Sequence, residues 1–416
     1  MRPIVADIAR AYASAGPISR VLVWLAAIYG LLAAVTVFGP VVPTNFPFFS
    51  LDYYMFRKGA LLAFAGANPY DIPSMLRDLR ADHISNFIPL FNYVSPPSLT
   101  VLLGPFTLLS RQPGSVLWTF ALVLPLVVGM VALCDGLPAR GAVALLSVLS
   151  PPAWQIYRYG QCDGLLALAL GLSWSSRAAR PGRAGAWASL ALVKPQIGVF
   201  CWLVFLLADG RRARYLQGLC LGLCVQVAVS CALLPHGFVQ WVWWLRSLLV
   251  FHGRIVVQSS GIGSLGVVVA AFPPGIPHTL ATLFLGGTLV VLLWLVSRHA
   301  RLLGRPRLLL ASLCLVGMLS PYLHPYDLLV LLPPLVVVAL RGEPLLLGVP
   351  LWSLAWQGTY YVLGSSAPMT LVALLPALAL ALRPVLPAPA ACLDRLAAAL
   401  AAAWERLPDA PRRRRG

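Results

Sequence analysis

Charged residues are scarce in this sequence of 416 residues, since Asp, Glu, Lys and Arg make up only 11% of it. A soluble globular domain carries about a quarter charged residues, which help to cover its surface in water. Hydrophobic residues make up 59%, and long apolar runs recur from Val21 to Leu382. The composition therefore excludes a soluble enzyme and predicts a polytopic helical membrane protein. The runs do not alternate with a period of two, which excludes a transmembrane barrel.

Acidic residues are fewer still, 13 against 31 Lys and Arg, and the formal net charge is +18. This charge does not indicate a nucleic-acid partner, because the basic residues stand in short clusters between apolar runs, as positive-inside sorting of loops produces. Lysine is nearly absent, with only Lys58 and Lys194. The eight cysteines form no CxxC motif, and half of them lie within apolar runs. We predict that they pack in the core and form neither disulfides nor a metal site.

A separate extramembrane domain is also missing. The longest polar stretch, residues 43–95, contains no G-x-G-x-x-G or P-loop motif. We predict one polytopic membrane domain over residues 1–383 with roughly 12 transmembrane helices. Its first span would cover residues 21–42 with a cytoplasmic N-terminus, so that 43–95 forms a long outer loop. A second long outer loop is expected over 236–276, and a cytoplasmic tail rich in Arg, Pro and Ala over 384–416.

The arginine clusters test this topology, and one of them does not fit. A further span over residues 96–110 would place Arg111 on the cytoplasmic side, together with the clusters at 211–214 and 298–307. The loop with Arg177, Arg180 and Arg183 would then fall outside, against the positive-inside rule. Two explanations remain open. The loop is a tolerated exception, or the expected span 184–208 breaks at Lys194-Pro195 and turns back, since proline disrupts a helix.

Polar residues in the first outer loop are the first candidates for chemistry. Asp52 is followed directly by two tyrosines and, a turn later, by Arg57 and Lys58. A turn over residues 66–71 then carries Asn68, Tyr70 and Asp71, since Gly, Asn and Pro all favour turns. The alternative is that these carboxylates are ordinary loop residues and that the aromatic side chains form an interfacial belt.

Four further polar clusters lie at the ends of apolar runs or inside them. Tyr93 precedes a Pro-Pro pair and could equally be a belt residue. Gln161 precedes Cys162-Asp163, where the carboxylate could equally be a helix cap or a polar contact between packed helices. Lys194 lies well inside an apolar run, where an ammonium is expensive and is by default functional or paired. The last cluster, over residues 320–327, contains His324, Tyr326 and Asp327, and a histidine at a helix end is commonly a capping residue.

The order of these motifs resembles that of the GT-C glycosyltransferases, most closely family 87, the polyprenyl-phosphate-mannose-dependent α-mannosyltransferases. The resemblance covers residues 52–327 and implies an all-α integral membrane enzyme with a GT-C fold. It implies that Asp52 is the catalytic base and that His324 is a second catalytic residue. Roles in substrate binding follow for a further set: Tyr53, Arg57, Lys58, Asn68, Tyr70, Asp71, Tyr93, Gln161, Lys194, Tyr326 and Asp327. The sequence departs from the family pattern at Phe56 and at Cys162-Asp163.

The expected reaction is transfer of a hexose, with mannose as first candidate, from a polyprenyl-phosphate donor to a glycolipid or glycan acceptor. It would proceed with inversion at the outer face of a bacterial plasma membrane, with no metal and no cofactor. Trp241, Trp243 and Trp244 in the second outer loop would line a groove for the lipid tail or form an interfacial segment. One alternative is a transporter or lipid flippase, which explains Lys194 and Asp163 as charges on a pathway. Another is a non-catalytic partner in envelope assembly.

Overall fold

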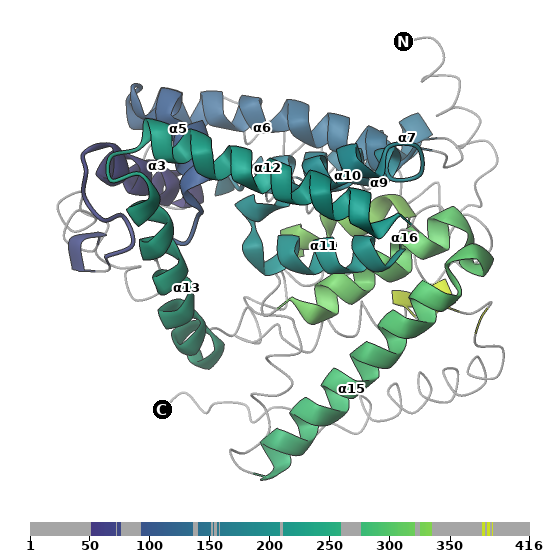
Figure 1. Cartoon of the computed structure of the whole chain (residues 1–416). Helices are drawn as coiled ribbons and strands as arrows, with labels where there is room; N and C mark the ends of the chain where they lie inside the picture. Colours follow the sequence, from purple (N-terminus) through teal and green to yellow (C-terminus); the bar gives the residue numbers. More distant parts are fainter. Residues whose placement is uncertain are drawn as a thin grey trace, which may run out of the picture.

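The structure is a computed structural model, and it describes a large central part of the chain (Figure 1). Every regular element in this part is a helix, which agrees with the expected all-α fold. The first expected span over 21–42, the tail over 384–416 and His324 lie outside the described residues. The described residues are 51–71, 73–75, 93–135, 140–150, 153, 156, 157, 159–208, 211–258, 276–320, 325–334, 377, 378, 381, 382 and 385.

Long apolar helices form the body of this part. Two of them, α6 (Arg111–Leu133) and α12 (Arg212–Leu233), are long and apolar enough to cross a membrane. Shorter apolar stretches lie in α11 (Pro195–Ala208), α15 (Ile276–Arg298) and α16 (Ala300–Leu319). Large apolar side chains are exposed on α6, α12 and α15, as lipid contact requires; they include Phe120, Leu124, Leu221, Val225, Phe284 and Val291. These helices support a membrane protein, but they do not confirm the expected twelve spans.

The helix α5 (Pro97–Thr107) does not cross the membrane by itself, so the span expected over 96–110 is wrong. Its 11 residues extend for roughly 16 Å, about half the thickness of a bilayer core. Both of its ends lie against α3 (Leu51–Phe64): Tyr93, just before α5, packs on Gly59, and Arg57 donates a hydrogen bond to the Leu109 carbonyl at 2.8 Å. Arg111, expected on the opposite side, lies with its guanidinium 4.5 Å from the centre of the Tyr54 ring on α3.

The chain turns back at Lys194-Pro195. The helices α9 (Asp163–Ser176) and α10 (Pro181–Ser189) form a hairpin, and the 3₁₀ turn η2 (Leu190–Val193) brings Lys194 back to the start of α9. The next helix, α11, runs the other way, and Arg211 beyond it donates a hydrogen bond to the Ala178 carbonyl in the α9–α10 turn. Pro195 is tolerated here because it is the first residue of α11, where an N–H has no helical partner.

The reversal of the chain at Lys194-Pro195 changes where the loop that did not fit the positive-inside rule lies relative to the other basic loops. The α9–α10 turn and the start of α12 lie at the same end of the described part, away from α3 (Figure 1). The junction of α15 and α16 lies toward this end as well (Figure 1). One end therefore collects the basic residues of both loops: Arg177, Arg180, Arg183, Arg211, Arg212 and Arg214. The second of the two explanations left open by the sequence holds.

This topology predicts which positions a membrane-impermeant maleimide labels together. In a background where Cys220 and Cys224 are Ser, Arg111→Cys should react from the same side as Pro73→Cys. Arg180→Cys and Arg212→Cys should react from the other side; Arg111, Pro73, Arg180 and Arg212 are all exposed. Labelling of intact and permeabilised cells would measure this. Labelling of Arg111→Cys together with Arg180→Cys would contradict the arrangement.

Glycines let two pairs of parallel helices approach closely. On α6 and α9, Gly164 lies against the Leu122 backbone and Gly171 against the Gly129 carbonyl. The helices α10 and α12 meet in the same way at Gly182 and Gly218. Small residues at such positions allow the backbone contacts by which membrane helices associate, because lipid supplies no hydrophobic driving force between them.

Gly171→Ala should therefore destabilise the protein by about 1–3 kcal/mol, because the added methyl group would overlap the Gly129 carbonyl of α6. Gly286→Ala on α15 is the matched control, since a Cβ there meets no described atom within 4 Å. It should be neutral or stabilising by up to about 1 kcal/mol through helix propensity. Thermal unfolding in detergent would measure both. Equal melting temperatures for the two variants would show that α6 and α9 are not closely packed.

The stretch expected to form the second outer loop contains the helix α13 (Phe238–Gln258), which leaves the body of the protein at an angle beside α3 (Figure 1). Trp241 and Trp244 on α13 are buried, and their rings meet edge to face at 5.5 Å. Trp244 also donates a hydrogen bond to the Val94 carbonyl at 2.9 Å. Trp244 thus joins α13 to the segment before α5, and the expected groove for a lipid tail stays a prediction.

Candidate active site

Asp52 lies in the first turn of α3, with its side chain partly buried. Gln161 Nε2 donates a hydrogen bond of 2.6 Å to Asp52 Oδ2, across 109 residues of sequence. Among the described residues, no hydrogen bond is made to the other oxygen, Oδ1. One oxygen is thus fixed by the protein.

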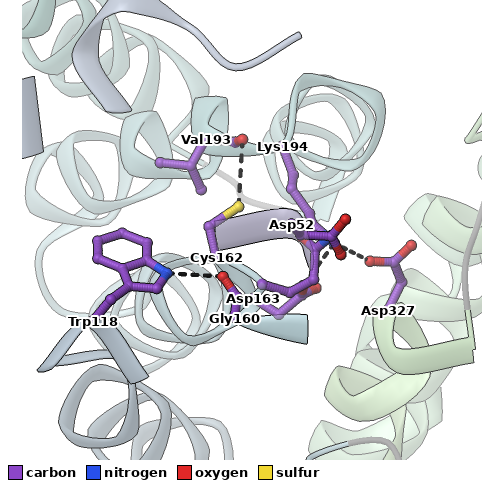
Figure 2. Close-up of polar contacts among 9 residues, drawn as sticks. Asp52, Trp118, Gly160, Cys162, Asp163, Val193, Lys194 and Asp327 are labelled. Carbon is purple, nitrogen blue, oxygen red and sulfur yellow. Dashed lines mark hydrogen bonds and ion pairs between the residues drawn. The ribbon is translucent and has the colours of Figure 1, made fainter. Parts of the chain in front are cut away.

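The turn before α9 brings Gln161 to Asp52. Gly160 has a φ of +67°, a conformation that glycine adopts without steric cost. Its carbonyl accepts a hydrogen bond of 2.8 Å from Trp118 Nε1 on α6 (Figure 2). A Cβ on Gly160 would lie 2.8 Å from the Cβ of Tyr53, so only glycine allows α3 to pack this closely. The contact between Gly160 and Tyr53 therefore holds α3 in place, and the next residue, Gln161, points toward the Asp52 carboxylate.

An ion triad lies beside Asp52. Lys194 Nζ lies 2.6 Å from Asp163 Oδ2 at the start of α9. It lies 2.5 Å from Asp327 Oδ1 on the 3₁₀ helix η3 (Pro325–Leu331). Figure 2 shows Asp52, Asp163, Lys194 and Asp327 around one point. The prediction that Lys194 is functional or paired is confirmed in its second form, because the ammonium is paired twice.

The triad is almost completely buried. Asp163 and Asp327 are each 3% exposed, and Lys194 is 5% exposed. Buried charges persist only where partners replace the water that they lose, and here each carboxylate has the ammonium as a partner. Asp163 also lies in the first turn of α9, where the helix dipole favours a negative charge.

The sequence did not place Asp163 in the site. The sequence prediction was a helix cap or a polar contact between helices, and the structure shows a first-turn carboxylate that is an ion-pair partner of Lys194. A signal was present, because a lysine inside an apolar run requires a carboxylate nearby. Which carboxylate it would be depended on the turn at Pro195, which the sequence left undecided.

Burial raises the pKa of Asp52 from its ordinary value of 3.8 to about 6. The loss of water around the charged form is the main cause. The hydrogen bond from Gln161 and the positive charge of Lys194 both favour the carboxylate and limit the rise. A carboxyl group with a pKa of about 6 is ionised at neutral pH, yet it is basic enough to accept a proton during a reaction.

Two predicted residues of α3 support the helix and do not point at the carboxylates. Tyr53 is fully buried, stacks on Trp118 at 6.3 Å and donates a hydrogen bond to the Phe106 carbonyl at 3.3 Å. Arg57 donates to the Leu109 carbonyl and so supplies a cation at the C-terminal end of α5, where the helix dipole favours one. Lys58, next along α3, is partly buried.

The predicted turn after α3 is present, and its polar side chains stabilise it. Asn68 Oδ1 accepts a hydrogen bond of 3.0 Å from the Tyr70 backbone N–H, as in an Asx turn. Asp71 Oδ2 accepts a hydrogen bond of 2.6 Å from the Ser74 hydroxyl. His236 approaches from the loop before α13, with its ring Nε2 2.8 Å from the Gly66 carbonyl. These contacts give Asn68 and Asp71 a local partner each.

Tyr70 and Tyr93 form a buried joint between this turn and α5. Their ring centres lie 5.4 Å apart. Tyr70 donates a hydrogen bond to the Ser95 carbonyl at 2.9 Å, and the Tyr93 hydroxyl lies 2.6 Å from the Thr100 hydroxyl. Both rings are buried, so the belt explanation does not describe them. His324 and the side chain of Tyr326 lie outside the described residues.

The described residues include no group of three or more His, Cys, Asp or Glu arranged to hold a metal ion. The carboxylates Asp163 and Asp327 have Lys194 between them. The absence of a metal and of a cofactor stays a prediction.

Comparison with known families decides the class of protein. The model of glycosyltransferase family 87 matches residues 93–325, more than half of the chain. The chain belongs to glycosyltransferase family 87. It is therefore a membrane glycosyltransferase of the GT-C superfamily, which confirms the resemblance found in the sequence.

The matched range of the family 87 chain includes Gln161, Asp163 and Lys194, but Asp52 and α3 precede it. The assignment of Asp52 to the site therefore depends on the hydrogen bond from Gln161 and not on the family match. No curated protein and no solved structure matches the chain.

Proposed function

We propose that this family 87 glycosyltransferase moves a hexose, with mannose as first candidate, from a polyprenyl-phosphate donor to a glycolipid or glycan acceptor. The reaction takes place at the outer face of the bacterial plasma membrane, on the α3 side of the protein. The arginine-rich end then faces the cytoplasm, as the positive-inside rule requires. The observation that carries the proposal is the hydrogen bond from Gln161 that fixes one oxygen of Asp52.

Asp52 acts as general base in a single displacement. Its Oδ1 takes the proton of the acceptor hydroxyl while that oxygen forms a bond to the anomeric carbon. The bond between the anomeric carbon and the phosphate oxygen breaks, and the polyprenyl phosphate leaves with the electron pair. A phosphate is already a good leaving group, so one carboxylate is sufficient, and the configuration at the anomeric carbon inverts.

The departing phosphate needs hydrogen-bond donors or cations directed at its growing negative charge. We assign this task to Lys58 and to His324, both expected on the α3 side. Arg57 is a weaker candidate than the sequence indicated, because its guanidinium already donates to the Leu109 carbonyl. Lys194 is a weaker candidate as well, because its ammonium lies between two carboxylates.

The transporter or flippase alternative loses its main support in this arrangement. It depended on Lys194 and Asp163 as charges along a transport pathway. The two residues form one buried ion pair at the start of α9, and Asp327 completes it. The family assignment also indicates group transfer.

The direct test is sugar transfer by the purified protein in nanodiscs, with radiolabelled polyprenyl-phosphate-mannose as donor and a lipid extract of the host as acceptor. A labelled product whose anomeric configuration is opposite to that of the donor is expected, with a chelator present throughout. Parallel reactions with arabinose and glucose donors would define the sugar. If no donor gives a product and none binds, the transfer proposal fails.

The transfer rate should increase with pH through a midpoint of about 6 and level off above it, because Asp52 must be ionised to accept a proton. Measurement of kcat/KM from pH 5 to 8 would show this in the free enzyme. A rate that stays constant down to pH 5 would contradict the role of a base with this pKa.

A further inference from the structure

We propose that Lys194 is a positioning residue for Asp52. Held between Asp163 and Asp327, it fixes the start of α9, and with it Gln161, against the base. Its charge also controls how readily Asp52 accepts a proton. This inference rests on the proposed role of Asp52 and adds residues that act through it.

The geometry links the triad to the base through three consecutive residues. Gln161 donates to Asp52 at 2.6 Å, and Asp163 lies 2.6 Å from the Lys194 ammonium. Between them, the Cys162 thiol lies 3.8 Å from the Val193 carbonyl, directly before Lys194. The start of α9 is therefore attached on one side to α3 and on the other to the turn at Lys194-Pro195. A displacement of Lys194 would be transmitted to Gln161 through the backbone.

The third partner extends this attachment to η3. Asp327 lies 2.5 Å from Lys194 Nζ, although 133 residues separate the two in sequence. Its side chain has no exposed surface, so the contact is shielded from solvent. Two of the three N–H donors of the ammonium are thus taken up by carboxylates. On this proposal, Lys194 acts on the reaction through other residues, because its ammonium is directed at these two carboxylates.

The charged groups around Asp52 define the electrostatic part of the proposal. Arg57 and Lys58 lie further along α3 itself, α5 carries no charged residue, and Arg111 at the start of α6 covers Tyr54. The α9, η2–α11 and η3 elements contribute only the triad members Asp163, Lys194 and Asp327. The positive charge of Lys194 favours the ionised form of Asp52. A negative charge on Asp163 or Asp327 acts in the opposite direction, because like charges disfavour ionisation.

The experiment measures protonation of Asp52 without any turnover. The carboxyl infrared signal that disappears in Asp52→Asn is titrated in otherwise wild-type protein and in three variants of the triad. Lys194→Gln should move the midpoint to higher pH by about one unit, and Asp163→Asn/Asp327→Asn should move it to lower pH by about as much. The variant with all three substitutions should titrate close to the wild type. Asp135→Asn, which alters an exposed pair with Arg140, is the matched control and should leave the midpoint unchanged.

Midpoints that move in opposite directions and cancel in the triple variant would support the proposal. A midpoint that stays in place in Lys194→Gln and in the Asp→Asn variants would overturn it. If Asp163→Asn/Asp327→Asn does not fold, either single variant should move the midpoint in the same direction by less, because the other carboxylate still pairs with Lys194. The titration does not depend on transfer, so it can succeed where every donor fails, and a failed titration leaves the transfer assay interpretable.

Discussion

Replacing Asp52 with Asn should lower kcat by about 10²–10⁴-fold and leave the protein folded. The amide has the shape of the carboxylate and can still accept the hydrogen bond from Gln161, which is 2.6 Å long in the wild type. It cannot take the proton of the acceptor hydroxyl, so only the chemical step is lost. Donor binding should change little, because the contacts that bind the donor are not removed.

Stability gives a second readout for the same variant. The pKa of Asp52 is raised to about 6 in the folded protein, compared with 3.8 for the ordinary group. The folded state therefore binds this proton more tightly than the unfolded state does. This stabilisation is complete below pH 4 and is lost as pH rises through 6. Asp52→Asn should consequently melt at a higher temperature than the wild type at pH 8, and the difference should shrink toward pH 5.

Transfer assays and thermal unfolding on the same preparations would check both expectations. Asp135→Asn is a suitable control, because Asp135 lies in an exposed pair with Arg140 at 3.7 Å, away from the site. It should keep wild-type turnover. Turnover by Asp52→Asn at the wild-type rate would remove Asp52 from the mechanism, whatever its effect on stability.

The sequence predicted which residues lie in the site better than it predicted which of them contact one another. Asp52 and Gln161 were both named as site residues, and the structure joins them directly. The cost of a buried ammonium predicted that Lys194 would have a partner. The sequence could not identify Asp163 as that partner, because the pairing exists only if the chain reverses at Pro195. Apolar composition is the same for a continuous span and for two shorter helices that meet at a proline.

Helix length and side-chain burial explain the other differences between the sequence predictions and the structure. The residues of α5 are as apolar as those of a membrane span, but 11 residues of helix are too few for a crossing, which needs about 20. Tyr53, Tyr70 and Tyr93 are aromatic residues near the expected membrane surface, where both a belt and a buried cluster are common. Only the contacts distinguish these possibilities: Gly59 lies against the Tyr93 ring and Gly160 against Tyr53.

Removing the lysine of the ion triad should have a large effect on folding stability. Lys194→Met should destabilise the protein by about 3–5 kcal/mol, because it leaves two carboxylates close together in a buried position without their cation. The triad as a whole should be worth far less than this. Replacing all members of a buried ion cluster by neutral residues of similar size is often neutral, since the cost of burying the charges disappears with their attraction.

Lys194→Met/Asp163→Asn/Asp327→Asn should therefore regain most of the stability that Lys194→Met loses. Thermal unfolding in detergent at pH 8, followed by tryptophan fluorescence, would compare the variants. Arg140→Met provides the control: its pair with Asp135 is 60% and 40% exposed, and its loss should cost less than about 1 kcal/mol. If Lys194→Met alone melts like the wild type, the triad is not buried as described. If the triple variant is no more stable than Lys194→Met, the loss comes from packing of the lysine side chain and not from unpaired charge.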